Sequence, residues 1–180
     1  MGRLHLRIIF RNGRWYCPEV VGPALGFGQY SFYTTSRVDS LDRNVVAGLF
    51  AYENDTSEMD VEFSLWGGLS STSSQYVVQP HHAYTFSIHL NGDYSTHRFV
   101  WTNDSVSFQS LHGHYSEPPN NGYIIAQWQY KSDHIPQTDS LRVDANLWLY
   151  HGSPPSDGKE AELIIQRFEF TPEPALPTPP

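Results

Sequence analysis

Apolar and polar residues alternate along short runs of this chain, and the alternation predicts β-strands. The runs are separated by Gly, Asn, Asp, Ser and Pro, with turn signals such as Asn12-Gly13 and Asn91-Gly92. The twelve candidate strands lie at 4–10, 14–21, 28–36, 45–53, 58–66, 74–79, 84–90, 96–102, 105–111, 124–130, 141–150 and 162–170. No stretch of 12 residues has the spacing of an amphipathic helix.

So many strands without helices favour two antiparallel sheets packed face to face. We therefore expect an all-β fold, a jelly-roll sandwich in which one concave sheet forms a substrate cleft. The domain is expected to span 1–171, because the last residues, TPEPALPTPP, carry five prolines in ten positions. We expect 172–180 to be an extended C-terminal tail, since proline cannot donate to a strand ladder.

Charge and composition narrow the classes of partner. The net charge is −8 with neutral His, and no run of Lys and Arg is present, so a nucleic acid is not expected. No apolar run of 18 residues predicts a membrane span, and the first ten residues do not read as a signal peptide. Cys17 is the only cysteine, so no disulfide can form within the chain. A monomer is expected.

One strand, SEMDVEFSLW at 57–66, carries the candidate chemistry. Glu58, Asp60 and Glu62 occupy alternate positions and therefore share one face, while the apolar residues between them face the core. Three like charges on one face of a strand repel one another, and proteins tolerate this mostly where it serves a function.

The strand alone allows three interpretations. It could be a solvated acidic face on an edge strand, or carboxylate oxygens could bind a hard cation such as calcium. The third is glycoside hydrolysis, in which a retaining enzyme needs a nucleophile and an acid/base with carboxyl groups roughly 5–5.5 Å apart. The Cα atoms of Glu58 and Glu62 are about 13 Å apart on an ideal strand, a gap that leaning side chains and sheet curvature reduce. Close carboxylates also split their pKa values, so that one is ionised while another keeps its proton.

The segment EMDVEF resembles the Glu-x-Asp-x-Glu signature of glycoside hydrolase family 16, the lichenase and laminarinase family. Four further segments are similar to that family in the same order, and together they cover about residues 4 to 171. They are GFGQYSF, NVVAGLFAYE, THRFVWTNDSVSF and LRVDANLWLY. No extra residue stands before the last Glu of this signature, and in this the segment resembles the lichenase branch of the family.

The resemblance implies a role for each acidic residue. Glu58 would be the nucleophile, Asp60 its assisting acid and Glu62 the acid/base of a retaining endo-β-glucanase. The alternation itself places the three together but does not distinguish nucleophile from acid. The substrate would be a β-1,3 or β-1,3-1,4 glucan, and the family implies an extracellular or cell-envelope location. It implies no cofactor for the reaction; a structural calcium occurs in the family, but its ligands cannot be assigned in this sequence.

Other residues are candidates for binding sugar. Asn146 and Trp148 share a face by alternation, and an amide and an indole suit a sugar hydroxyl and a sugar ring. Tyr30 and Phe50 are expected to line the same groove. The segment SQYVVQP presents Gln75 and Gln79 as further candidates, and Val77 shares their face.

Two departures from the family pattern motivate an alternative. Thr56 stands where the family often has Trp, and the 74–79 strand offers Gln75, Val77 and Gln79 where the family presents Asn and Tyr. The alternative is a carbohydrate-binding jelly-roll module without catalytic activity. A third class is a calcium-dependent structural or lectin domain that uses the three carboxylates.

Overall fold

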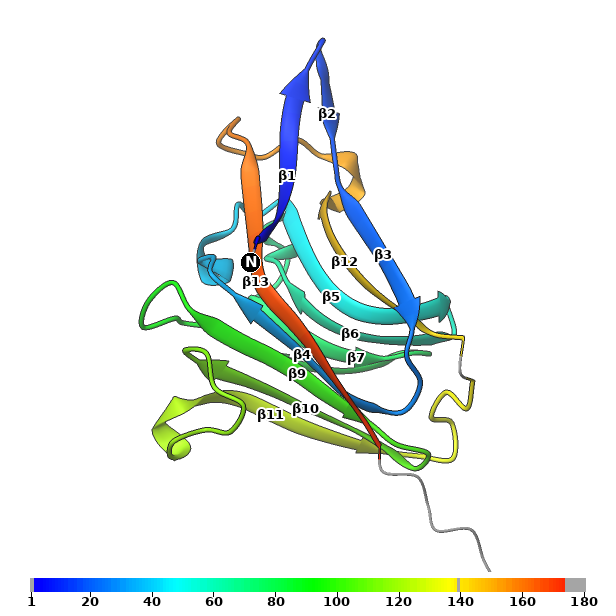
Figure 1. Ribbon diagram of the computed structural model, residues 1–180. Helices are drawn as coiled ribbons and strands as arrows, with labels where there is room; N and C mark the ends of the chain where they lie inside the picture. Colours follow the sequence, from blue (N-terminus) through cyan, green and yellow to red (C-terminus); the bar gives the residue numbers. More distant parts are fainter. Residues whose placement is uncertain (1, 139, 174–180) are drawn as a thin grey trace, which may run out of the picture.

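The computed structural model describes residues 2–138 and 140–173, and strands dominate this part of the chain (Figure 1). The strands are β1 (Leu4–Arg11), β2 (Arg14–Tyr16), β3 (Glu19–Ala24), β4 (Gly28–Thr34), β5 (Val45–Asn54), β6 (Ser57–Phe63), β7 (Ser74–Val78), β8 (His82–Phe86), β9 (Ser95–Trp101), β10 (Ser105–His112), β11 (Ile124–Lys131), β12 (Arg142–Leu149) and β13 (Ala161–Pro172). Four short 3-10 helices connect some of them: η1 (Val38–Ser40), η2 (Trp66–Gly68), η3 (Asn121–Tyr123) and η4 (Tyr150–Gly152). Within the described residues, no helix is long and apolar enough to cross a membrane.

The strands form two sheets whose neighbouring strands are antiparallel. A 7-stranded sheet has the order β11-β10-β9-β4-β13-β1-β2, and a 6-stranded sheet has the order β3-β12-β5-β6-β7-β8. Figure 1 shows the smaller sheet curved, with β5, β6 and β12 bowed along their length. The predicted all-β sandwich of two antiparallel sheets is confirmed.

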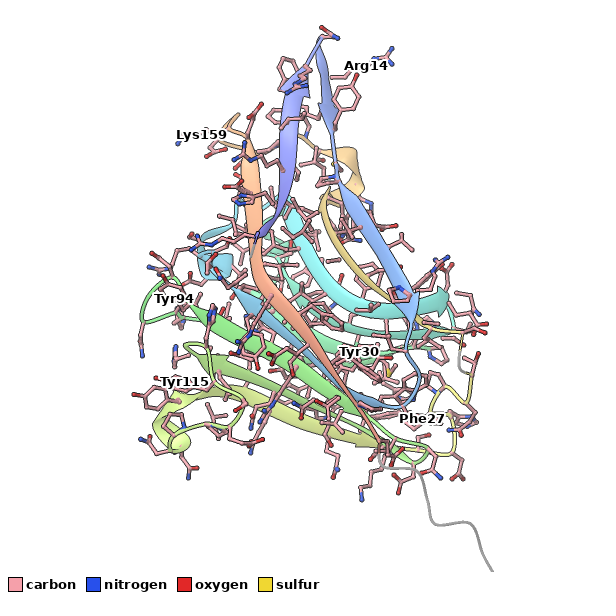
Figure 2. All side chains as sticks on the ribbon, viewed as in Figure 1. Arg14, Phe27, Tyr30, Tyr94, Tyr115 and Lys159 are labelled. Atoms are coloured by element: carbon pink, nitrogen blue, oxygen red, sulfur yellow. The ribbon has the colours of Figure 1, made fainter. Side chains whose placement is uncertain are left out.

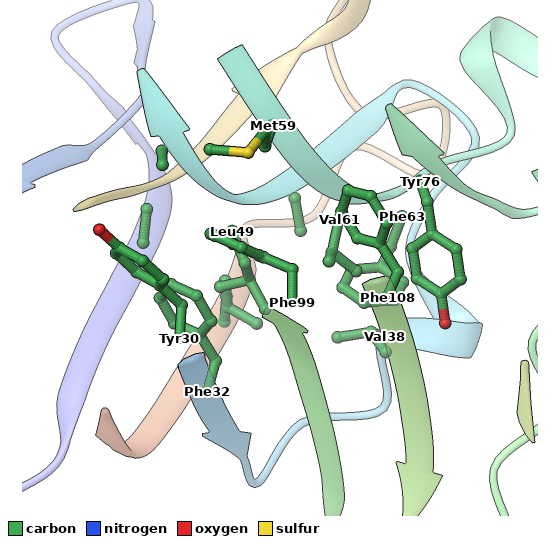
Figure 3. Close-up of a cluster of buried hydrophobic side chains, with 14 of the residues drawn as sticks. Tyr30, Phe32, Val38, Leu49, Met59, Val61, Phe63, Tyr76, Phe99 and Phe108 are labelled. Atoms are coloured by element: carbon green, nitrogen blue, oxygen red, sulfur yellow. The ribbon is translucent and has the colours of Figure 1, made fainter. Parts of the chain in front are cut away.

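The core lies between the two sheets and follows from the alternation within each strand. On β6, the side chains of Met59, Val61 and Phe63 are fully buried, as expected. They face Phe99 and Phe108 of the larger sheet (Figure 3). Burial of such side chains is the main favourable contribution to the folding free energy.

The predicted strand at 14–21 is two strands that belong to different sheets. β2 pairs with β1 in the 7-stranded sheet, whereas β3 pairs with β12 in the 6-stranded sheet. The break falls at Pro18, which has no N–H to donate; its carbonyl oxygen accepts from Leu147 N at 3.1 Å. The chain therefore crosses from one sheet to the other at this proline.

The predicted strand at 84–90 ends early, at Phe86. Beyond Phe86, side-chain oxygens accept hydrogen bonds from backbone N–H groups that would otherwise pair with a neighbouring strand. Ile88 N donates to Ser73 Oγ at 3.1 Å, and Leu90 N donates to Asp39 Oδ2 at 2.8 Å. Of the tail expected at 172–180, Pro172 is the last residue of β13, and 174–180 lie outside the described residues.

Candidate active site

β6 lies inside the 6-stranded sheet, between β5 and β7, and carries the three acidic residues on the face that points away from the core. Asp60 is only 5% exposed, and Glu58 and Glu62 are half-buried. A solvated edge strand would leave such residues exposed. The structure thus brings the three carboxyl groups together on an interior strand, as the alternation predicted, and withdraws them in part from water.

Glu62 lies in a cross-strand row with polar partners on both sides. Its neighbours are Gln75 on β7 and Gly48 on β5, and Gly48 in turn is opposite Asn146 on β12. Gln75 Nε2 donates to Glu62 Oε2 at 2.5 Å. A Cβ at Gly48 would lie 2.7 Å from Asn146 Oδ1, so only glycine leaves room for this amide. Two of the predicted sugar-binding residues, Gln75 and Asn146, therefore flank the predicted acid/base.

Asp60 lies in the next row, between apolar side chains. Phe50 of β5 and Val77 of β7 are opposite it, and each is 6% exposed. These two apolar side chains help to shield the carboxyl group from water. Neither offers it a hydrogen bond. Phe50 thus lies on the predicted face, where it separates Asp60 from Asp144 of β12.

Burial raises the pKa of all three carboxyl groups, but to different extents. The pKa of Asp60 lies well above its usual range because of burial, then the negative charges of Glu58 and Glu62, and then a hydrogen bond to Glu58. Burial also raises the pKa of Glu58, although the hydrogen bond from Asp60 opposes this. For Glu62, burial raises the pKa and the hydrogen bond from Gln75 opposes it. Asp60 therefore holds its proton most strongly and can donate it to Glu58.

Two further carboxylates near this face were missed by the sequence analysis. Asp144 is 2% exposed, and burial raises the pKa of its carboxyl group. Its Oδ1 accepts from Gly22 N at 3.3 Å, and Arg142 lies 3.9 Å from its Oδ2. Glu19 of β3 is opposite Asn146, and its Oε2 accepts from the Asn146 amide at 3.3 Å. The alternation that identified Asn146 and Trp148 also places Asp144 on their face, so the signal was present in the sequence.

The remaining predicted residues lie in different places. Trp148 is half-buried on β12, two positions from Asn146, with its ring centroid 6.3 Å from that of Tyr150. Gln79 follows β7, and its side chain accepts from His81 N at 2.9 Å while its backbone N donates to Glu58 O at 3.0 Å. The side chain of Gln79 therefore stabilises the turn after β7.

The prediction that Tyr30 lines the groove is wrong. Tyr30 belongs to β4 of the larger sheet and is 0% exposed. Its ring stacks on Phe99 with centroids 4.7 Å apart, and its hydroxyl donates to Gly26 O at 2.7 Å (Figure 3 shows it within the buried cluster). The alternation of β4 places Tyr30 on the same face as Phe32, and that face is the core.

No group of three or more His, Cys, Asp or Glu side chains that could hold a metal ion is found among residues 2–138 and 140–173. The three carboxylates of β6 are thus not arranged as such a group. The structural calcium that the family resemblance allows stays without assigned ligands.

Comparisons with known proteins give a consistent picture of the fold. No family model and no curated protein matches the chain. Among solved structures, a β-1,3-glucanase from Mycobacterium marinum is similar with a TM-score of 0.67 and 18% identity, covering 94% of this chain and 74% of the glucanase. A prokaryotic β-1,3-1,4-glucanase (lichenase) from a mouse hindgut metagenome is similar with a TM-score of 0.65 and 16% identity, covering 95% of this chain and 80% of the lichenase. The Bacillus licheniformis β-glucanase is similar with a TM-score of 0.62 and 19% identity, covering 95% of this chain and 78% of that enzyme. At these identities the likeness concerns the backbone, and the chain has the jelly-roll fold of the β-glucanases.

Proposed function

We propose that this protein is a retaining endo-β-glucanase that hydrolyses β-1,3 or β-1,3-1,4 glucan. The observation that carries the proposal is the set of three carboxyl groups on one face of β6 with unequal proton affinities. Double displacement needs one ionised carboxylate and one carboxylic acid, and a set with unequal proton affinities is suited to these two roles. The glucanases with the same fold support the choice of substrate class.

In the first step, an oxygen of the Glu58 carboxylate bonds to the anomeric carbon while the bond to the leaving sugar oxygen breaks. Glu62 gives its proton to that oxygen, because burial keeps the Glu62 carboxyl group protonated to a higher pH than usual. In the second step, the Glu62 carboxylate takes a proton from water. The water oxygen bonds to the anomeric carbon as the bond to Glu58 breaks.

Asp60 supports the nucleophile in this scheme without reacting itself. Its proton is held by burial between Phe50 and Val77 and donated to Glu58. That hydrogen bond favours the ionised form of Glu58, the form that attacks. Trp148 and Asn146 on β12 are suited to contact a sugar ring and a sugar hydroxyl next to Glu62.

The partner is therefore a neutral polysaccharide, which suits a face that carries several carboxylates. We propose that the enzyme works outside the cell or in the cell envelope, because such polymers lie there. A monomer suffices, since one strand supplies all three carboxyl groups.

A carbohydrate-binding module without catalysis is the second candidate, and Val77 favours it. A polar side chain opposite Asp60 would contact sugar, whereas Val77 offers no hydrogen bond and Gln79 is engaged in its turn. Both candidates predict glucan binding, and only the enzyme releases new reducing ends.

The test measures reducing-sugar release from lichenan, laminarin, xyloglucan, agarose and carrageenan. Wild type is compared with Glu58→Gln, Glu62→Gln and, as a matched control, Glu53→Gln on the exposed end of β5. We expect release from a β-glucan that Glu58→Gln abolishes and Glu53→Gln leaves unchanged. Wild-type rates in Glu58→Gln would overturn the proposal, and binding without release would favour the module.

The two glutamates are distinguished with an aryl β-glucan oligosaccharide whose leaving group needs no proton. Glu62→Gln should still release the aryl group in a first turnover, because acid assistance is then unnecessary. Glu58→Gln should not, since the nucleophile is absent. The opposite result would exchange the two roles.

A further inference from the structure

Three tyrosines surround a hollow of about 470 Å³ at one end of the 7-stranded sheet. Tyr94 comes from the loop before β9, and Tyr115 and Tyr123 come from the segment between β10 and β11. Figure 2 shows Tyr94 and Tyr115 on neighbouring loops at the same end of this sheet. The hollow is in the range of small-ligand sites, and its residues come from the sheet that does not carry Glu58.

The hollow is held in shape by contacts between its two loops. Gly113 N donates to Tyr94 O at 2.8 Å, and Thr96 Oγ1 donates to Gly113 O at 2.8 Å. Gly113 has a φ of +77°, and a Cβ there would lie 2.6 Å from the ring of Tyr115. Glycine is therefore required at this position, both for the positive φ of the turn and to leave room for the Tyr115 ring. A site preformed in this way loses little entropy when it binds a ligand.

The chemistry of the hollow suits an uncharged ligand with flat apolar faces and hydroxyl groups. Tyr94 is 53% exposed, and the ring of Tyr115 meets that of Tyr123 edge to face with centroids 5.2 Å apart. Asn91 and His112 also line it, and His112 Nδ1 is buried without a hydrogen-bond partner among the described residues. The lining contains no Asp, Glu, Lys or Arg. Aromatic rings with a few convergent polar groups are typical of sites for pyranose sugars.

We propose that this hollow is a second carbohydrate-binding site, which holds a neutral pyranose segment of a polysaccharide on the sheet opposite the carboxylates. It would keep the protein on an insoluble polymer while the β6 face engages a chain. The binding itself does not depend on hydrolysis.

A proline-rich peptide is the other class of ligand that aromatic grooves accept, and the chain ends in such a sequence. The sheet places Pro172, the last residue of β13, at the end away from the hollow. Pro172 is opposite Gly28, which is opposite Trp101, whereas the hollow lies beyond Ser95 at the other end of β9. The geometry therefore favours sugar over this peptide.

The test measures binding to insoluble β-1,3-glucan by depletion from solution, in a Glu58→Gln background so that the polymer is not consumed. Tyr94→Ala should weaken binding about 3- to 10-fold, the range expected for loss of one aromatic contact. Tyr94→Phe should restore it. The matched control is Tyr16→Ala, which removes a similarly exposed tyrosine from β2 at the far edge of the sheet and should leave binding unchanged.

A second measurement separates this site from the catalytic face. With Glu58 intact, Tyr94→Ala should lower release from the insoluble glucan and leave the rate on a short soluble oligosaccharide unchanged. Unchanged binding in Tyr94→Ala, equal loss in Tyr16→Ala, or Tyr94-dependent binding of the peptide TPEPALPTPP without glucan binding would each overturn the proposal. If hydrolysis is absent but Tyr94-dependent binding is present, the proposed function fails and this site stands.

Discussion

Gln75 Nε2 donates a hydrogen bond to Glu62 Oε2 across the β6–β7 pair, with 2.5 Å between the two atoms. The bond favours the ionised form of Glu62, whereas burial of the same carboxyl group favours the protonated form. The pKa of the proposed acid/base is thus set by two opposing effects, and one of them can be removed by a single substitution.

Gln75→Leu should shift the basic limb of the pH profile to higher pH. Leucine has a similar size but no donor, so the carboxylate loses its partner and the pKa of Glu62 rises further. The acid then keeps its proton to a higher pH, and kcat/KM measured against pH shows the shift. Gln127→Leu, on an exposed position of the other sheet, is the control. A limb that stays in place or moves to lower pH would contradict the assigned role of Glu62.

Asp60→Asn should flatten the pH dependence of stability above pH 4. Because the folded-state pKa of Asp60 is raised, its contribution to stability is fully present below its usual pKa of 3.8 and is lost as the pH rises through the folded-state pKa. One proton gives at most about 1.4 kcal/mol per pH unit. Urea unfolding at several pH values between 4 and 8 measures the slope.

The control for Asp60 is a carboxylate whose pKa is shifted the other way. Hydrogen bonding to Arg37 lowers the pKa of Asp39, so its contribution is present at neutral pH and lost as the pH falls. Asp39→Asn should therefore lose stability at neutral pH more than at pH 3. Equal slopes in wild type and Asp60→Asn would show that Asp60 does not keep its proton in the folded protein.

Gly48→Ala should impair activity more than stability. The added Cβ would lie 2.7 Å from Asn146 Oδ1 and 3.3 Å from the Phe50 ring, so the amide must move from its place beside Glu62. Overpacking of this kind typically costs about 1–3 kcal/mol, and the end of an amide side chain can yield. We expect kcat/KM to fall at least about tenfold. Gly2→Ala, with no atom within 4 Å of its Cβ, is the control. Full activity in Gly48→Ala would remove Asn146 from the site.

His97 should make the protein acid-sensitive. It is fully buried in the core, where its ring nitrogens lie 2.9 Å from Ser95 Oγ and 2.9 Å from Ser110 Oγ, and burial lowers its pKa to about 3. Its contribution to stability is present above the unfolded pKa of about 6.5 and is lost as the pH falls, by about 1.4 kcal/mol per pH unit. His97→Gln should therefore be less stable than wild type at pH 7, by an amount that shrinks towards pH 4. The exposed His89→Gln is the control, and a pH-independent difference would contradict the argument.

The alternation of residues predicted the fold and the acidic face because one face of β6 is entirely apolar. It failed at Tyr30, since both faces of β4 carry a tyrosine and the pattern does not say which one faces the core between the sheets. It did not single out Asp144, although Asn146 lies on the same face, because alternation gives the face of a residue and not its burial. The role of Gly48 depends on a neighbour almost a hundred positions away in the chain, and no local pattern contains it.

The pairing of β1 with β13 joins the first and last strands of the described residues. β13 also pairs with β4, so this strand lies between two strands that precede it by more than a hundred residues. During synthesis, the larger sheet therefore cannot close until β13 has left the ribosome, and until then β1 and β4 are unpaired on that side. Closure of such long loops is slow, so we expect the larger sheet to form only once β13 is available, and the chain to depend on chaperones or dilution to avoid aggregation until then.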